Sequence, residues 1–91
     1  MGRKLTKNTG TKDARYNTIN VMLKAGGVKN FAYIFKFLPK TVVAKDMGIT
    51  VPRCTTVINR PDELTLAEIR KLAQLFDYDF KKFLNLIAKE V

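Results

Sequence analysis

Apolar residues recur along this chain at the three- and four-residue spacing of helices, in short blocks that glycine, proline or polar residues separate. Two blocks follow the i, i+3, i+4, i+7 pattern and would each bury one stripe: Phe31, Ile34, Phe35 and Leu38, and Phe80, Phe83, Leu84 and Ile87. No stretch longer than a few residues alternates as a half-buried strand does. The pattern therefore predicts an all-α fold.

Residues that start or stop helices set the expected boundaries. We expect helices over about residues 14–25, 31–38, 40–47, 51–59 and 66–76, and a last one from residue 80. Thr65 and Glu68 form a capping box, Asn30 and Asp79 are N-caps, and Gly26-Gly27 ends the first helix. The helix after the capping box should bury Leu66, Ile69, Leu72, Ala73 and Phe76.

Residues 43–76 read as two short helices split by a tight turn, then a polar loop and a longer helix. Small Ala44 lets another helix approach closely, and Met47 faces inward one turn later. Gly48 can adopt the left-handed conformation that ends a helix, and Ile49 fills the corner. Thr50 can accept a hydrogen bond from the first free amides of the next helix. This layout is typical of a helix-turn-helix.

Charge is unevenly distributed along the 91 residues, whose formal net charge is +9. Residues 1–40 hold nine Lys/Arg and one Asp, a net +8, which leaves +1 for residues 41–91. Residues 1–13 offer only Leu5 to bury, so we expect a flexible basic arm ahead of one domain at 14–91. Its cations, with the next one along the chain, are Arg3, Lys4, Lys7, Lys12 and Arg15. Such an arm binds DNA phosphates or remains a solvated tail.

Several classes of function lack the residues they need. The chain has no His and a single Cys, so we expect no enzyme, metal site, cofactor or disulfide, and no ligand pocket is evident. Cys54 falls at an inward helical position and should be a small buried side chain. The first residues lack the apolar region of a signal peptide, and no run approaches the ~20 apolar residues that span a bilayer. We expect a cytoplasmic protein without a membrane partner.

Residues 31–87 resemble the phage-repressor and Cro-like (XRE) helix-turn-helix family, with no gap needed over 43–84. The family's small residue before the turn is Ala44, its turn is Gly48-Ile49-Thr50, and its "polar, Leu, x, x, Leu, x, x, Leu-Ala" helix is residues 65–73. Its two buried recognition-helix positions are Cys54 and Val57. We thus expect a compact five-helix bundle, lambda-repressor-like, to which the helix at 14–25 is an addition.

The resemblance implies a transcription regulator, repressor-like, that binds double-stranded DNA as a homodimer and inserts residues 51–59 into the major groove. It places base contacts at outward positions of that helix: Arg53, Thr55, Thr56 and Asn59. It places phosphate contacts at Lys40, Thr41, Thr50 and Arg60. Arg53 would be the guanine reader.

The chain departs from the family pattern at three places, and the first of them, Val51 and Pro52, favours an alternative. Val51 and Pro52 stand where members often have polar readers, and Arg60-Pro61 stands where they often have Gly-Lys. The run at 55–58 is β-branched, which lowers helix propensity by a few tenths of a kcal/mol per residue relative to Ala. The alternative is a non-enzymatic protein-interaction or structural module, such as a phage or mobile-element component or an antitoxin, that keeps the scaffold without reading sequence.

Overall fold

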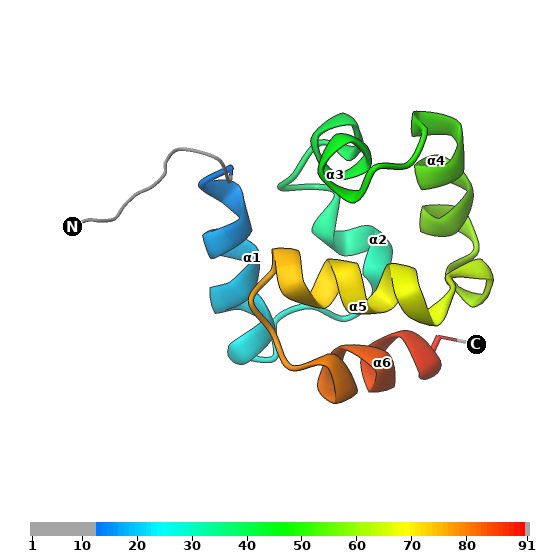
Figure 1. Ribbon diagram of the computed structural model, residues 1–91. Coiled ribbons are helices and arrows are strands. Elements are labelled where there is room, and N and C mark those ends of the chain that lie inside the picture. Colours follow the sequence, from blue (N-terminus) through cyan, green and yellow to red (C-terminus); the bar gives the residue numbers. More distant parts are fainter. Residues whose placement is uncertain (1–12, 91) are drawn as a thin grey trace.

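The computed structural model describes residues 13–90, and this part of the chain contains helices and turns but no strand (Figure 1). The helices are α1 (Arg15–Lys24), α2 (Phe31–Ile34), α3 (Lys40–Met47), α4 (Val51–Asn59), the short 3-10 helix η2 (Pro61–Glu63), α5 (Leu66–Leu75) and α6 (Phe80–Ala88). The all-α prediction is confirmed. Four cations of the predicted basic arm, Arg3, Lys4, Lys7 and Lys12, lie outside the described residues.

The expected five-helix count is wrong, because residues 13–90 form six α-helices in one packed body. The difference is α1, which the sequence places within the domain at 14–91 but outside the five-helix family pattern. Tyr16, Ile19 and Leu23 of α1 are 5% exposed or less and belong to the same core as α3, α5 and α6. The leading helix is therefore a structural part of the domain.

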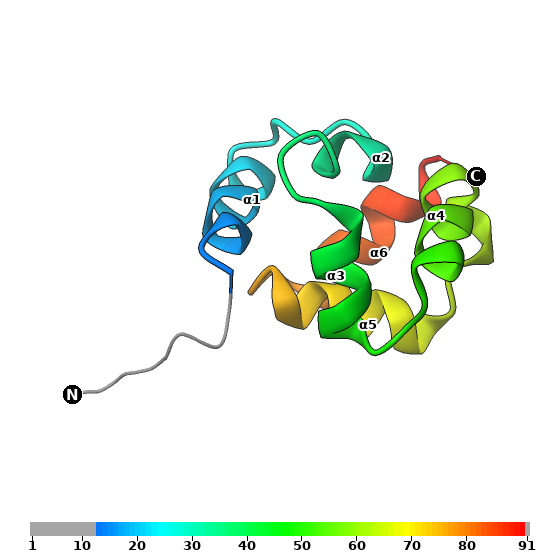
Figure 2. The same cartoon turned by 90° about the horizontal axis from the view of Figure 1, so that it is seen from above.

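Helix α5 lies near the middle of the molecule, with α6 beneath it and α3 and α4 above it in the view of Figure 1. Helices α1 and α4 are at opposite sides in that view and also when the molecule is seen from above (Figure 2). Aromatic rings fill the centre: Phe83 meets Phe31 with ring centroids 6.3 Å apart and Phe76 at 5.7 Å, both edge-on. This is a favoured geometry for aromatic pairs.

Helix α2 is shorter than the predicted 31–38. Asn30 caps it as expected, its side chain accepting from the Tyr33 amide at 2.8 Å. Beyond Ile34 the amides of residues 35–37 bond three residues back instead of four, which tightens the helix into successive turns. Pro39 follows, and the residue before a proline is disfavoured in the α conformation. Leu38 is nevertheless buried, as the apolar pattern predicts.

The prediction that α5 buries five residues is wrong for one of them, Leu66. Leu66 is 61% exposed, whereas Ile69, Leu72, Ala73 and Phe76 are buried. Leu66 is the first residue of α5, one turn before the first buried residue of the stripe, Ile69. Leu64, two residues earlier, enters the core in its place.

Two polar side chains fasten α1 to distant parts of the chain. The Tyr16 hydroxyl donates to Asp46 Oδ2 in α3 at 2.7 Å, and burial beside this carboxylate raises the pKa of Tyr16. Asn20, a buried residue, donates from Nδ2 to the carbonyls of Phe76 and Asp77 at 2.9 and 2.8 Å. Both carbonyls lie directly after the last residue of α5, and carbonyl groups at the end of a helix have no hydrogen-bond partner within the helix. Asp77 has φ 50°, the left-handed region.

Candidate nucleic-acid interface

The turn between α3 and α4 has the predicted local geometry. Gly48 has φ 76°, and the Ile49 amide donates to the Ala44 carbonyl at 3.0 Å, which closes the end of α3. The Thr50 hydroxyl accepts from the Arg53 amide at 3.2 Å and caps α4. Ala44 is 1% exposed, as close packing between the two helices requires. The expected roles of Gly48 and Thr50 are confirmed.

Helix α4 buries two inward side chains, half-buried Ile58 packs against the core beside them, and the opposite face is exposed. Cys54 and Val57 are each 1% exposed, as predicted, and burial raises the pKa of the Cys54 thiol. Pro52, Thr56 and Asn59 stand at i, i+4 and i+7 on the opposite face and are exposed. Val51 is exposed beside them, and Thr55 and Arg53 are half-buried. The helix therefore presents one continuous outer surface to a partner.

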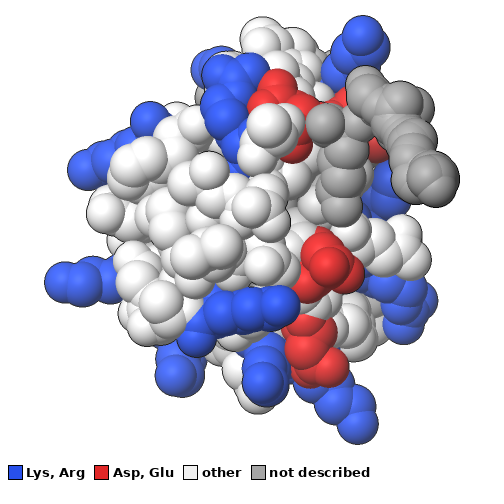
Figure 3. All heavy atoms as spheres, turned by 90° about the vertical axis from the view of Figure 1, so that its left-hand side faces the viewer, with Lys and Arg blue, Asp and Glu red and all other residues white. Residues whose placement is uncertain are grey.

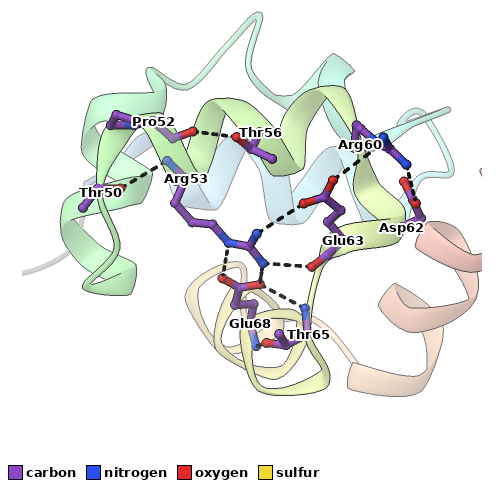
Figure 4. A network of polar contacts seen from close by, with 9 residues as sticks. All are labelled: Thr50, Pro52, Arg53, Thr56, Arg60, Asp62, Glu63, Thr65 and Glu68. Atoms are coloured by element: carbon purple, nitrogen blue, oxygen red, sulfur yellow. Dashed lines mark hydrogen bonds and ion pairs between the residues drawn. The ribbon is translucent and has the colours of Figure 1, made fainter.

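Arg53 is engaged within the protein, which the sequence analysis did not anticipate (Figure 4). Its Nη2 and Nε donate to the two carboxylate oxygens of Glu68 at 2.9 and 3.2 Å. Nη2 also donates to the Glu63 carbonyl at 2.8 Å, and Nη1 lies 3.6 Å from the Glu63 carboxylate. A bidentate arginine–carboxylate ion pair is among the stronger polar contacts in proteins. The side chain runs from α4 toward the first turn of α5.

Glu68 serves two contacts at once. Its Oε1 accepts from the Thr65 amide at 3.0 Å while Thr65 accepts from the Glu68 amide at 3.1 Å, so the predicted capping box is confirmed. The same carboxylate receives Arg53, and its side chain is only 14% exposed. The hydrogen bond from Arg53 is the largest cause of the lowered pKa of Glu68. The capping box thus also ties α4 to α5.

The remaining predicted contacts differ in how available they are. Lys40 and Thr41 are exposed at the start of α3, and Thr50 is exposed at the start of α4. Arg60 pairs with Asp62 at 3.2 Å and approaches Glu63 at 3.5 Å. The Thr56 hydroxyl donates to the Pro52 carbonyl at 3.0 Å. The two helix starts therefore offer exposed polar groups in this region, as Asn59 does at the end of α4.

Arg15 lies in α1 and not in a free arm. Its guanidinium pairs with Asp13 at 2.7 Å, and this contact lowers the pKa of Asp13 to about 2. On the side of the molecule that carries α1, blue and red side chains are intermixed, and blue ones lie around the edge (Figure 3). The positive charge of the described residues is not gathered into one patch on that face.

The described residues, 13–90, contain neither a candidate metal site nor a candidate membrane-spanning helix. This part holds no group of three or more His, Cys, Asp or Glu residues arranged to bind a metal ion. No helix in it combines the length and apolar character needed to cross a bilayer. Comparison of the chain with family models, curated proteins and solved structures gives no match.

Replacing Glu68 separates its capping role from its ion pair. Glu68→Ala should lower the free energy of unfolding by about 1–2 kcal/mol, because the capping box and the bond from Arg53 are both lost. Glu68→Gln keeps a side chain that caps but removes the charge, so its loss should be smaller. Urea unfolding at pH 7 measures both, and equal losses would show that the cap contributes nothing.

The same variants have a signature in pH. Folding lowers the pKa of Glu68, so its contribution to stability is present above the ordinary glutamate pKa and is lost as pH falls through the folded value. As pH falls from about 4.5 through the lower folded value, the parent should therefore lose more stability than Glu68→Gln. Parallel profiles for the two proteins would contradict this.

Proposed function

We propose that this chain is a sequence-specific, repressor-like DNA-binding protein that regulates transcription by inserting α4 into the major groove. The observation that carries the proposal is the mounting of α4. Gly48 and Thr50 set its start, and Cys54 and Val57 fix its inner face. A helix held in this way presents its outer surface and first turn as a rigid unit, which is how helix-turn-helix proteins meet base edges.

Charge supports a polyanionic partner. A net +9 on 91 residues attracts DNA at long range, and exposed Lys40, Thr41 and Thr50 stand at helix starts that favour phosphate. These contacts would fix orientation, while Thr55, Thr56 and Asn59 are the outward polar groups for base edges. Helix-turn-helix proteins often bind as homodimers to half-sites about one helical turn apart, and we extend this to the present chain.

One observation favours the alternative, a non-enzymatic interaction or structural module. Arg53 within α4 and Arg60 directly after it are both paired with carboxylates. Exposed Val51 and Pro52 add apolar surface and no side-chain donor. A helix with these features also suits a protein partner, because charged residues are depleted at the core of protein interfaces.

Selection of binding sites from random duplex DNA tests the proposal. A DNA-binding regulator should enrich one short motif, and the duplex carrying it should bind at least a thousandfold tighter than random DNA in the same salt. Sedimentation of the complex then gives the number of chains per site. Weak binding without an enriched motif would refute sequence reading and favour the alternative.

The basic N-terminal segment gives a separate prediction. Tyr16 bonds Asp46 in α3, so the described chain begins beside α3, and twelve extended residues reach at most about 40 Å. Deleting residues 1–12 should therefore lower the magnitude of the slope of log affinity against log salt by about 0.9 for each lost phosphate contact. The deletion removes Arg3, Lys4, Lys7 and Lys12.

A variant with these four cations changed to Gln keeps the length of the segment and serves as the matched control. It should reproduce the change in slope, for any duplex sequence. Parallel lines for the parent and both variants would show that the segment makes no phosphate contact.

A further inference from the structure

Over its first two turns the outer surface of α4 is rich in methyl and methylene groups and poor in hydrogen-bond donors, and Asn59 supplies an amide side chain only at its end. Val51 is 37% exposed and purely apolar. Pro52 is exposed and has neither a side-chain donor nor an amide proton. Thr56 is exposed on the same face as Pro52, and it gives its hydroxyl proton to the Pro52 carbonyl at 3.0 Å, as Figure 4 shows. Thr56 therefore offers a partner its methyl group and an acceptor oxygen.

Arg53, the one cation of α4, is directed elsewhere. Both carboxylate oxygens of Glu68 and the carbonyl of Glu63 receive its guanidinium, at 2.8–3.2 Å. Moving it to a base edge would break these bonds and leave the largely covered Glu68 carboxylate without its cation. This arrangement makes Arg53 a positioning residue that joins α4 to α5.

The four bases present different chemical groups to a protein in the major groove. Guanine presents two acceptors and needs a donor such as Arg, cytosine presents a donor, and thymine alone presents a methyl group. The apolar surface on the first two turns of α4 suits the methyl group of thymine. We propose that α4 recognises thymine methyl groups through Val51 and Thr56, an inference that rests on the proposed function. The preferred DNA would then have A·T pairs opposite this part of the helix.

Thymine and deoxyuridine differ only in that methyl group, which gives a direct test. In the selected site, each thymine is replaced in turn by deoxyuridine, and the Kd is measured for the full-length protein at fixed salt. We expect one or two positions at which the loss of the methyl weakens binding by about three- to fivefold, the value of one buried methyl. Replacements outside the footprint of α4 should have no effect.

Protein variants then assign these positions to residues. Thr56→Ser keeps the hydroxyl and removes only the methyl, so it should bind the thymine and deoxyuridine sites equally at its own position. Val51→Ala should do the same at a neighbouring position. Thr18→Ser, the same change at an exposed position of α1, is the matched control and should keep the parent's ratio. Selection with Arg53→Met, checked for folding by its melting curve, should return the parent motif.

The outcomes separate this inference from the proposed function. A motif with guanine opposite α4 that disappears in Arg53→Met would overturn the inference while supporting a DNA-binding regulator. An A·T-rich motif insensitive to deoxyuridine would also overturn it, because the sequence would then be read through DNA shape. Absence of any motif would overturn the proposed function itself.

Discussion

A chain that begins at Gly27, and so lacks α1, should fail to fold as a cooperative domain. Tyr16, Ile19 and Leu23 would be missing from the core, and each buried apolar side chain of this size contributes about 1.5–3 kcal/mol. Their combined loss approaches the 5–15 kcal/mol that stabilises an ordinary domain. Circular dichroism during heating should show a broad, weak transition in place of a cooperative one.

A chain that begins at Asp13 is the matched control. It keeps α1, the Tyr16 to Asp46 bond and both bonds from Asn20. We expect it to melt within a few degrees of the full-length protein. A cooperative transition at the parent temperature in the chain from Gly27 would show that α1 contributes little to the stability of the domain.

Gly48→Val should lower the free energy of unfolding by about 1–3 kcal/mol, because a β-branched residue fits poorly at φ 76°. A Cβ at Gly48 would meet no heavy atom within 4 Å, so the loss comes from the backbone conformation and not from a clash. For a domain of this size each kcal/mol corresponds to about 4–8 °C in the melting temperature. Thermal unfolding measures it.

Two further variants identify the cause of that loss. Gly48→Asn should be milder, since asparagine tolerates the left-handed region better than other residues with a side chain. Gly27→Ala lies at a glycine without positive φ, where the new Cβ would make only an ordinary 3.6 Å contact with the Met22 carbonyl, so stability should hardly change. Equal losses for Gly48→Val and Gly48→Asn would contradict a conformational origin.

Features that depend on neighbouring residues could be predicted from the sequence. The caps at Thr50, Thr65 and Asp79 involve an amide three residues away, and the turn at Gly48 involves a carbonyl four residues earlier. The buried positions of α4, Cys54 and Val57, are the two that the family resemblance implies, and they lie one helical turn apart. In each case the residues that decide the structure lie within one or two turns of each other.

Features that depend on distant residues could not be predicted in this way. Helical period indicates that Arg53 lies off the buried stripe of α4, but its long side chain bends to Glu68, fifteen residues along the chain. Asn20 reads as an ordinary polar residue until the end of α5 is brought beside it. Leu66 shows the reverse, because an apolar residue at the right spacing stays outside when Leu64 occupies the core.

The contacts of Asn20 also bear on how the protein is made. Its two acceptors lie 56 and 57 residues further along the chain, so they do not exist when α1 leaves the ribosome. At synthesis rates of about 5–20 residues per second, the interval between Lys24 and Asp77 lasts roughly 3–10 s. During that time the apolar side of α1 has no native partner in α5 or α6. Helix α1 is thus synthesised seconds before its partners at the end of α5, and its apolar side is a surface that a chaperone acting on the nascent chain would meet.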